Sequence, residues 1–434
     1  MSPEITTIMM FGGILVAVFL GFPIAFTLTG LGFIFGYIGW GPSFIPLLAS
    51  RAYSIMTNMP LIAIPLFIFM GSVLSSSGIA EVAYDVMHRL FGKFKGGLAL
   101  ATIVICTLFA ACTGIVGASV TTMGLVALPS MIDRKYNKSL ATGVVTAGGT
   151  LGILIPPSIM LILYGPLAGI SVAKLFAAAF LPGFLLSALY MIYVIIRSNL
   201  DENFAPAISG DYKKVTLLEF VKALVPFTFL VFAVLGAIFF GVTAPTEAAG
   251  LGAFGSIIVA AGYRKLNYKN IYDACITTVK ISAMVMFMAL GASVFTSVFF
   301  GIGGGNVVTQ FINNIGLGAN GSLALLLFIV FLLGMFIDWI GILLIVVPIF
   351  LPILKSYGFD PLWTGMLVML IMQTSFLTPP FAYSLYYVKA IAPEGVTLNH
   401  IYKGAIPFIV LQVIGVLLCI LFPRIITWLP TILY

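Results

Sequence analysis

The two halves of this chain repeat one sequence pattern, and each copy contains a Pro-Pro pair inside an apolar stretch. The pairs are Pro156-Pro157 and Pro379-Pro380, 223 residues apart. Further matches hold nearly the same separation: Leu128-Pro129, Thr142-Gly143, Gly21, Gly30, Leu31, Gly32 and Gly71 recur as Leu351-Pro352, Thr364-Gly365, Gly241, Gly250, Leu251, Gly252 and Gly291. A long repeat with a break in each apolar half is typical of membrane transporters whose binding site lies between the halves.

Two uncharged segments, residues 96–132 and 281–337, are much longer than the ~20 residues that cross a bilayer. Only 8% of the residues are charged, against about 25% in a soluble domain. We therefore predict an all-α polytopic membrane protein, because a helix satisfies its own backbone polar groups in lipid. The four cysteines, Cys106, Cys112, Cys275 and Cys419, lack metal-site spacing, and we expect each to be buried.

Two function classes find no support in the sequence. The net charge of +7 is spread over loops, which argues against a nucleic-acid-binding surface. No HExxH, GxSxG or P-loop pattern is present, so the chain is not expected to be an enzyme or to hydrolyse ATP.

Apolar runs and breakers predict five spans in each half. In the first half they cover residues 6–22, 23–40, 60–77, 140–164 and 175–197, and in the second half residues 222–240, 245–262, 282–300, 361–387 and 405–421. Each half also holds an apolar pair of helices that returns to its side of entry, near residues 97–132 and 322–354. Limbs of ~15 residues rise only ~22 Å, less than the ~30 Å hydrocarbon core, which favours re-entrant hairpins over full crossings.

Five crossings per half give the two copies opposite orientations, which is an inverted-topology repeat. We assign residues 1–199 to the first repeat, 200–221 to a polar cytoplasmic linker and 222–434 to the second repeat. With the N-terminus outside, sixteen basic residues face the cytoplasm and four face outward: Arg51, Lys174, Lys355 and Arg424. The positive-inside rule therefore predicts two periplasmic termini, with the first hairpin opening to the cytoplasm and the second to the periplasm.

The two breaks are the first candidate site. Prolines remove backbone donors and glycines permit unwinding, so carbonyl groups inside the bilayer need new partners. A cation such as sodium is one such partner, and a kinked helix with packing glycines is the alternative. The candidate residues in the first copy are Gly149, Thr150, Pro156, Pro157 and Ser158, and in the second Gln373, Thr374, Ser375, Thr378, Pro379 and Pro380. Satisfied interhelical hydrogen bonds are the competing explanation for the second set.

The two hairpin tips are the second candidate site. The first tip carries Thr113, Gly114 and Ser119. Small and hydroxylated residues of this kind can either bind an ion or allow close packing of helices. The second tip carries Asp338, the only charged residue between Lys280 and Lys355. An ionisable group at membrane depth is costly and usually functional, although at an aqueous surface Asp338 would only cap a helix.

These residues resemble the large membrane subunit of tripartite ATP-independent periplasmic (TRAP) transporters. The matching segments are residues 60–67, 152–158, 244–248, 334–338 and 377–380. The resemblance implies an elevator-type transporter of the bacterial inner membrane with sodium as coupling ion and no other cofactor. It also implies a small organic anion, a carboxylate, delivered by a periplasmic substrate-binding (P) protein, and a separate small membrane (Q) subunit.

On the family pattern the tips and breaks form the sodium and substrate region. The resemblance places sodium near Thr113, Gly114, Ser119, Asp338, Gly341 and Thr378. The first tip departs from the serine-rich family pattern because Ile115-Val116 follow Thr113-Gly114, so backbone carbonyls with Ser119 are better ligand candidates there. A related carboxylate or cation exchanger that needs no binding protein is the alternative function. The sequence leaves substrate identity, ion number and oligomeric state undetermined.

Overall fold

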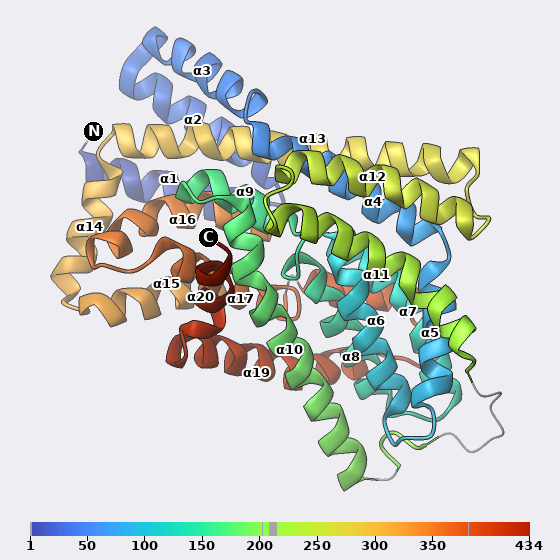
Figure 1. Ribbon diagram of the computed structural model, residues 1–434. Coiled ribbons are helices and arrows are strands. Elements are labelled where there is room, and N and C mark those ends of the chain that lie inside the picture. The colour runs from blue at the N-terminus through green and yellow to red at the C-terminus, as the bar shows by residue number, and fades with distance from the viewer. Residues whose placement is uncertain (1, 202, 208–214, 381) are drawn as a thin grey trace.

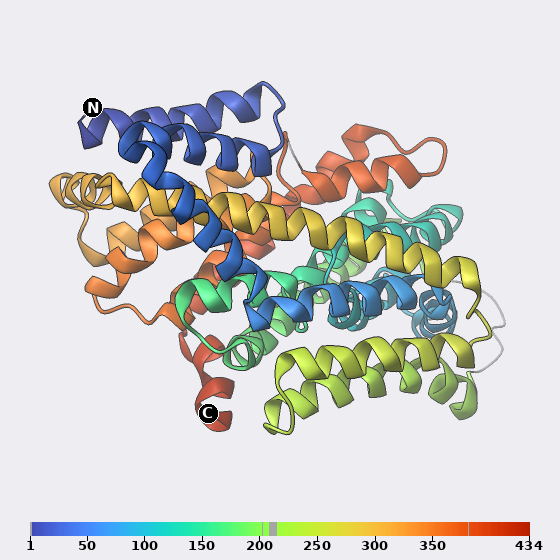
Figure 2. The ribbon, with the colours of Figure 1, turned by 90° about the horizontal axis from the view of Figure 1, so that it is seen from above.

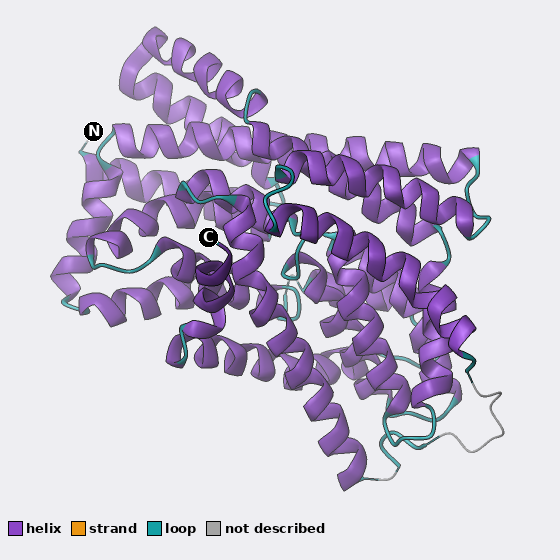
Figure 3. Ribbon diagram, in the orientation of Figure 1, coloured by secondary structure: helices purple, strands orange, loops and turns teal. Residues whose placement is uncertain are grey.

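A computed structural model describes residues 2–201, 203–207, 215–380 and 382–434, and all regular elements in these ranges are helices (Figure 3). The first half contains α1 (Pro3–Phe19), α2 (Ile24–Trp40), α3 (Phe44–Met56), α4 (Ala63–Ser76), α5 (Ile79–Phe91), α6 (Gly97–Thr113), α7 (Val116–Asp133), α8 (Lys138–Thr150), α9 (Ile159–Ala168) and α10 (Val172–Leu200), with short 3-10 turns η1 (Gly41–Ser43), η2 (Met59–Ile62) and η3 (Leu151–Ile153). The second half contains α11 (Leu217–Phe239), α12 (Pro245–Gly262), α13 (Tyr268–Gly301), α14 (Gly304–Ile315), α15 (Gly318–Gly334), α16 (Trp339–Ser356), α17 (Pro361–Ser375), α18 (Tyr383–Ile391), α19 (Leu398–Leu421) and α20 (Arg424–Leu433).

The predicted all-helical membrane fold is confirmed, and eight of the described helical segments are long and apolar enough to cross a bilayer. Three helices were not predicted, namely α3, α14 and α20. The predicted span 282–300 was too short, because α13 begins at Tyr268 and carries charged residues such as Asp273 and Lys280 on exposed turns. A prediction from hydrophobicity places the end of such a helix at its first charged residues, although an exposed helical turn accepts polar side chains.

A layer of long helices runs along one side of the molecule (Figure 1). It consists of α2, α4, α12 and α13, and α13 packs against both α2 and α4; we call these four helices the α13 layer. Repeat-related glycines permit two equivalent close contacts in it. A Cβ atom on Gly32 would lie 2.9 Å from Val294 of α13, and one on Gly252 would lie 2.7 Å from Met70 of α4. The two contacts follow the sequence repeat, since α2 corresponds to α12 and α4 to α13.

The other main group contains the hairpins and the broken helices. Helices α6 and α7 form the first hairpin and α15 and α16 form the second, while α8–α9 and α17–α18 carry the two breaks. We call these eight helices the hairpin bundle, which lies beneath the α13 layer in the view of Figure 1. The repeats exchange partners inside it, because α9 packs on α16 and α18 packs on α7. Each broken helix pair therefore contacts both hairpins, because α8 also packs on α6 and α7, and α17 on α15 and α16.

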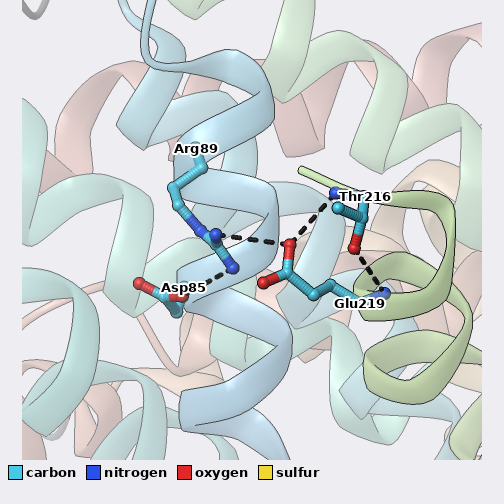
Figure 4. A network of polar contacts seen from close by, with 4 residues as sticks. All are labelled: Asp85, Arg89, Thr216 and Glu219. Atoms are coloured by element: carbon cyan, nitrogen blue, oxygen red, sulfur yellow. Dashed lines mark hydrogen bonds and ion pairs between the residues drawn. The ribbon is translucent and has the colours of Figure 1, made fainter. Parts of the chain in front are cut away.

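A polar contact joins α5 to α11 at the surface. Helix α5 connects α4 to the first hairpin, and its Arg89 lies 3.1 Å from Asp85 and 3.5 Å from Glu219 of α11 (Figure 4). Thr216 and Glu219 form a capping box at the start of α11, with a backbone N–H of Thr216 donating to the Glu219 carboxylate at 3.0 Å. At the other chain end, α20 packs against α10, and both termini are marked in Figure 2.

The predicted linker is only partly described. Helix α10 ends at Leu200 and α11 begins at Leu217, and residues 202 and 208–214 lie outside the described part. The described linker residues contact the hairpin bundle, because the N–H of Gly96 donates to Ala205 O at 2.9 Å and that of Asn137 to Phe204 O at 2.9 Å.

Candidate functional site

The first tip and the first break meet at a pair of buried hydroxyl groups. Helix α6 ends at Thr113, and Gly114 takes a φ of +58°, which lets the chain reverse into α7. The hydroxyls of Thr113 and Ser119 are 2.5 Å apart and fully buried. A Cβ atom on Gly152 would lie 3.1 Å from Ser119 Oγ and 3.3 Å from Thr113 Oγ1. The unwound end of α8 therefore lies directly against the polar side chains of the tip.

The first break is enclosed by protein. Both prolines are buried, their peptide bond is cis, and a Cβ on Gly114 would lie 3.6 Å from the Pro157 carbonyl oxygen. Ser158 caps α9, with its hydroxyl donating to Ile153 O and accepting from Leu161 N.

Two other predicted residues of this break have local roles. A Cβ on Gly149 would lie 3.0 Å from the Val120 backbone nitrogen, so Gly149 serves the close approach of α8 to α7. The Thr150 hydroxyl donates to Ala147 O at 2.8 Å within its own helix.

The second break contains buried polar atoms without partners. Gln373 is fully buried, and neither its amide oxygen nor its amide nitrogen has a hydrogen-bond partner among the described residues. The Ser375 hydroxyl is also unpartnered there, and it lies against Gly334 at the end of α15. An unpaired buried polar group costs about 1–3 kcal/mol. The unpartnered atoms include both donors and acceptors, so this region suits a polar ligand, and its oxygens suit a cation.

The threonines and prolines of the second break are arranged differently. Thr374 and Thr378 donate their hydroxyls to Ile371 O and Thr374 O, both at 2.6 Å. The cis pair Pro379-Pro380 is exposed, unlike its buried counterpart in the first repeat. The two breaks therefore share a sequence pattern and differ in environment.

The second tip presents Asp338 to a cavity. Asp338 is partly buried and caps α16, and one carboxylate oxygen accepts from Ile340 N at 3.2 Å. A cap uses one oxygen, so the carboxylate retains further acceptor capacity. Gly341 is placed elsewhere: a Cβ on it would lie 3.1 Å from Ile24, so it serves the contact between the second tip and α2.

A cavity of about 420 Å³ brings the two tips together with the α13 layer. Gly114 and Gly117 of the first tip and Asp338 of the second line it from the hairpin bundle. The α13 layer contributes the start of α2, at Pro23–Ala25, and the face of α13 that carries Ile281, Met284, Val285 and Met288. The described lining contains one carboxylate and no lysine, arginine or histidine. Of the predicted site residues, only Gly114 and Asp338 reach this cavity.

Two tyrosines of the cavity, Tyr383 and Tyr387, lie outside the predicted site regions. Trp339, Phe376, Tyr383 and Tyr387 line the cavity, and the Tyr387 ring lies over Gly117 of the first tip. Both tyrosines share the cavity with Asp338. Tyr383 and Tyr387 stand four residues apart directly after the second Pro-Pro pair, which puts them on one helix face. That spacing next to a break is the signal that would have found them.

Glu247 has the ordinary role of a helix N-terminal acid. Its carboxylate accepts from the Ala244 N–H at 3.3 Å at the start of α12. Cys275 is exposed, so the expectation of four buried cysteines was wrong for it; Cys106, Cys112 and Cys419 are buried. Cys275 lies on the polar N-terminal part of α13, which the predicted span had left out.

Comparison with known proteins decides the family. The model of the family described as "Tripartite ATP-independent periplasmic transporter, DctM component" matches residues 11–425. The chain belongs to the DctM family of TRAP transporters. The resemblance found in the sequence is thereby confirmed, and members of this family are permeases rather than enzymes.

Individual DctM relatives cover most of the chain. It is 29% identical over 392 residues to the C4-dicarboxylate TRAP transporter large permease protein DctM of Pseudomonas aeruginosa, covering 90% of this chain and 91% of that one. It is 31% identical over 367 residues to the ectoine/5-hydroxyectoine TRAP transporter large permease protein UehC of Ruegeria pomeroyi, covering 83% of each. The YdaH transporter of Alcanivorax borkumensis shares the fold, with a TM-score of 0.68 at 12% identity over 92% of this chain and 97% of that one.

Proposed function

We propose that this DctM-family chain imports a small organic anion, a carboxylate, by sodium-coupled secondary transport with an elevator movement. The observation that carries the proposal is the cavity in which both hairpin tips meet α2 and α13. In an elevator movement the hairpin bundle carries its ligands past the α13 layer. A binding site lined from both groups is what such a movement requires.

The charge of the cavity supports a requirement for cations. Asp338 is the only charged residue in the described lining. Two like unit charges 5 Å apart repel by about 3 kcal/mol at an effective dielectric constant of 20. A carboxylate therefore binds weakly beside an unneutralised Asp338, and a sodium ion at this carboxylate removes the repulsion. The unpartnered oxygens of Gln373 and Ser375 in the second break, and the hydroxyls and carbonyls of the first tip, are of the type that sodium prefers.

The proposed assembly follows the family. A small membrane (Q) subunit and a periplasmic substrate-binding (P) protein act with this chain in the inner membrane, and both termini face the periplasm. The Pseudomonas aeruginosa relative is named for C4-dicarboxylates, which supports a carboxylate here. A thermal-shift screen of the periplasmic binding protein that works with this chain would identify which one.

The test is uptake into sealed proteoliposomes that contain the full chain and its small subunit. The binding protein and its labelled carboxylate are added outside, with an inward gradient of either sodium or potassium. We expect uptake with sodium only, and Asp338→Ala abolishes it. Equal uptake with potassium would refute sodium coupling, and normal uptake by Asp338→Ala would remove this residue from the mechanism.

Asp360→Ala is the matched control. Asp360 also caps a helix, accepting from Leu362 N at 2.9 Å, and it is exposed outside the cavity. Both substitutions remove a cap, worth about 1 kcal/mol, so a difference in uptake between them reports the cavity role of Asp338. Uptake that persists without the binding protein would favour the stand-alone exchanger instead.

A further inference from the structure

A second cavity, of about 420 Å³, lies farther along α13 than the cavity of the tips. Helix α13 lines the first cavity from Ile281 to Met288 and the second from Ala289 to Phe300. The remaining walls come from α3, from α9 and from α16. The second cavity therefore also lies between the α13 layer and the hairpin bundle.

The two cavities carry opposite charge. Arg51 of α3 lines the second cavity, together with Asn58 and three hydroxyl residues on one face of α13: Ser293, Thr296 and Ser297. Arg51 is partly buried, and no ion pair or hydrogen bond joins its guanidinium to another residue in the described ranges. It is also one of the four basic residues on the side predicted to be periplasmic. The first cavity has Asp338 as its charged residue.

We propose that the Arg51 cavity is an anion-capture site, which takes the carboxylate on the periplasmic side before it reaches the cavity of the tips. A guanidinium recognises a carboxylate with two parallel hydrogen bonds. The Asn58 amide and the Ser293 hydroxyl supply additional donors around it, whereas Thr296 and Ser297 donate their hydroxyls to Ala292 O and Ser293 O within α13. The proposal rests on the proposed import of a carboxylate and adds a specific residue to it.

The placement of Arg51 gives the transport cycle a direction. Arg51 belongs to α3, which packs against α13, whereas Asp338 belongs to the hairpin bundle. When the bundle moves, the substrate leaves Arg51 behind and keeps only the Asp338 environment. A ligand shifts an equilibrium only through its different affinity for two states. The guanidinium therefore favours capture from the periplasm without slowing release into the cytoplasm.

The experiment measures the charge selectivity of each cavity with cysteine reagents. The exposed Cys275 is replaced in the full-length chain (Cys275→Ser), and a reporter thiol is introduced by Ser293→Cys in the second cavity or Met284→Cys in the first. Each thiol reacts with an anionic (sulfonatoethyl) or a cationic (trimethylammonioethyl) methanethiosulfonate. Each reaction rate is divided by the rate of the same reagent with free mercaptoethanol, which corrects for the intrinsic reactivity of the reagent. No sodium and no substrate are present, so the result is independent of whether sodium-driven uptake is observed.

We expect the anionic reagent to be preferred at Ser293→Cys and the cationic reagent at Met284→Cys. Arg51→Gln should reduce the preference at Ser293→Cys by at least about 3-fold, the Coulomb effect of a unit charge near the surface, and Arg51→Lys should largely retain it. Arg424→Gln, which removes another predicted periplasmic cation outside both cavities, should leave it unchanged. An equal preference in the Arg51→Gln and unaltered chains would overturn the proposal.

A second measurement needs no change at Arg51. Potassium acetate and potassium chloride are compared at equal ionic strength for their effect on the reaction of Ser293→Cys with neutral methyl methanethiosulfonate. Acetate should slow the reaction at millimolar concentration and chloride should not. Equal effects of the two salts would show that Arg51 does not hold a carboxylate in this cavity, and would leave contact with another protein as its role.

Discussion

Gly71 of α4 controls the position of the first tip. A Cβ atom at this position would lie 2.7 Å from both Thr113 Cα and Thr113 O, and 3.1 Å from Cys112 O. These are backbone atoms of the tip, so no side-chain rotation relieves the overlap. Gly71→Ala should therefore displace the end of α6 or move α4 away from it.

The size of the displacement follows from the contact distances. Ordinary van der Waals contact begins at 3.4 Å, so the tip must move by about 0.7 Å to accommodate the methyl group. Overpacking of this kind costs about 1–3 kcal/mol of unfolding free energy. Misplacement of binding groups by about 1 Å lowers activity by up to ~10²-fold. We expect a lower melting temperature and a much larger loss of uptake.

The assay combines thermal unfolding of the purified chain with uptake into proteoliposomes. Gly250→Ala is the matched control, because Gly250 lies within α12 and a Cβ there would meet nothing within 4 Å. A glycine-to-alanine change inside an open helical position adds about 0.5–1 kcal/mol of stability. Gly250→Ala should therefore be neutral or stabilising and retain uptake.

The reasoning would be refuted by equal behaviour of the two variants. If Gly71→Ala melts at the same temperature as Gly250→Ala and transports at the same rate, the tip does not depend on close contact with α4. If both variants lose stability equally, a general intolerance of alanine in these helices explains the loss.

Three further predictions follow from buried contacts. Gln373→Leu should raise the melting temperature, because it removes two unpartnered buried atoms whose burial costs about 1–3 kcal/mol of stability. The same substitution should lower sodium-dependent uptake. A lower melting temperature would show that the amide has hydrogen-bond partners. Gly404→Ala should prevent stable folding, since its Cβ would lie 2.1 Å from Ser139 O, and normal yield and melting temperature would contradict this. Tyr387→Phe keeps the ring in the cavity and should raise the KM of uptake about 2–10-fold, which corresponds to the loss of one hydrogen bond. The exposed control Tyr53→Phe should not change the KM. An unaltered KM for Tyr387→Phe would show that its hydroxyl does not bind substrate.

Much of the fold was predictable because a bilayer imposes strong local rules. Apolar length and the breaks at Gly and Pro identified the long spans and both hairpins. The repeated Gly32 and Gly252 lie at equivalent helix contacts, with α13 and with α4, which the structure revealed. The failures were helices that are neither long nor uniformly apolar, such as α14 and the N-terminal part of α13, where the polarity signal resembles that of a loop.

The site was predictable only in its polar and ionisable members. Asp338 stood out because a charge at membrane depth is rare, and the cavity does contain it. Tyr387 and Met284 did not stand out, because lipid-facing and protein-facing positions of a membrane helix are both apolar. Side-chain periodicity, which separates the two faces of a soluble helix, therefore carries little information here.

The sequence by itself determined the repeated frame, the two broken helices and the acid at the second tip. These depend on chain-local chemistry: hydrocarbon length, missing backbone donors and the cost of a buried charge. The tertiary structure alone decided that the two tips share one cavity with α13, that Gln373 has no partner in the described chain, and that Arg51 lines a separate cavity along the same helix. The two cavities arise from packing between segments more than 200 residues apart, such as Gly114 with Asp338 and Arg51 with Ser293, which no local pattern records.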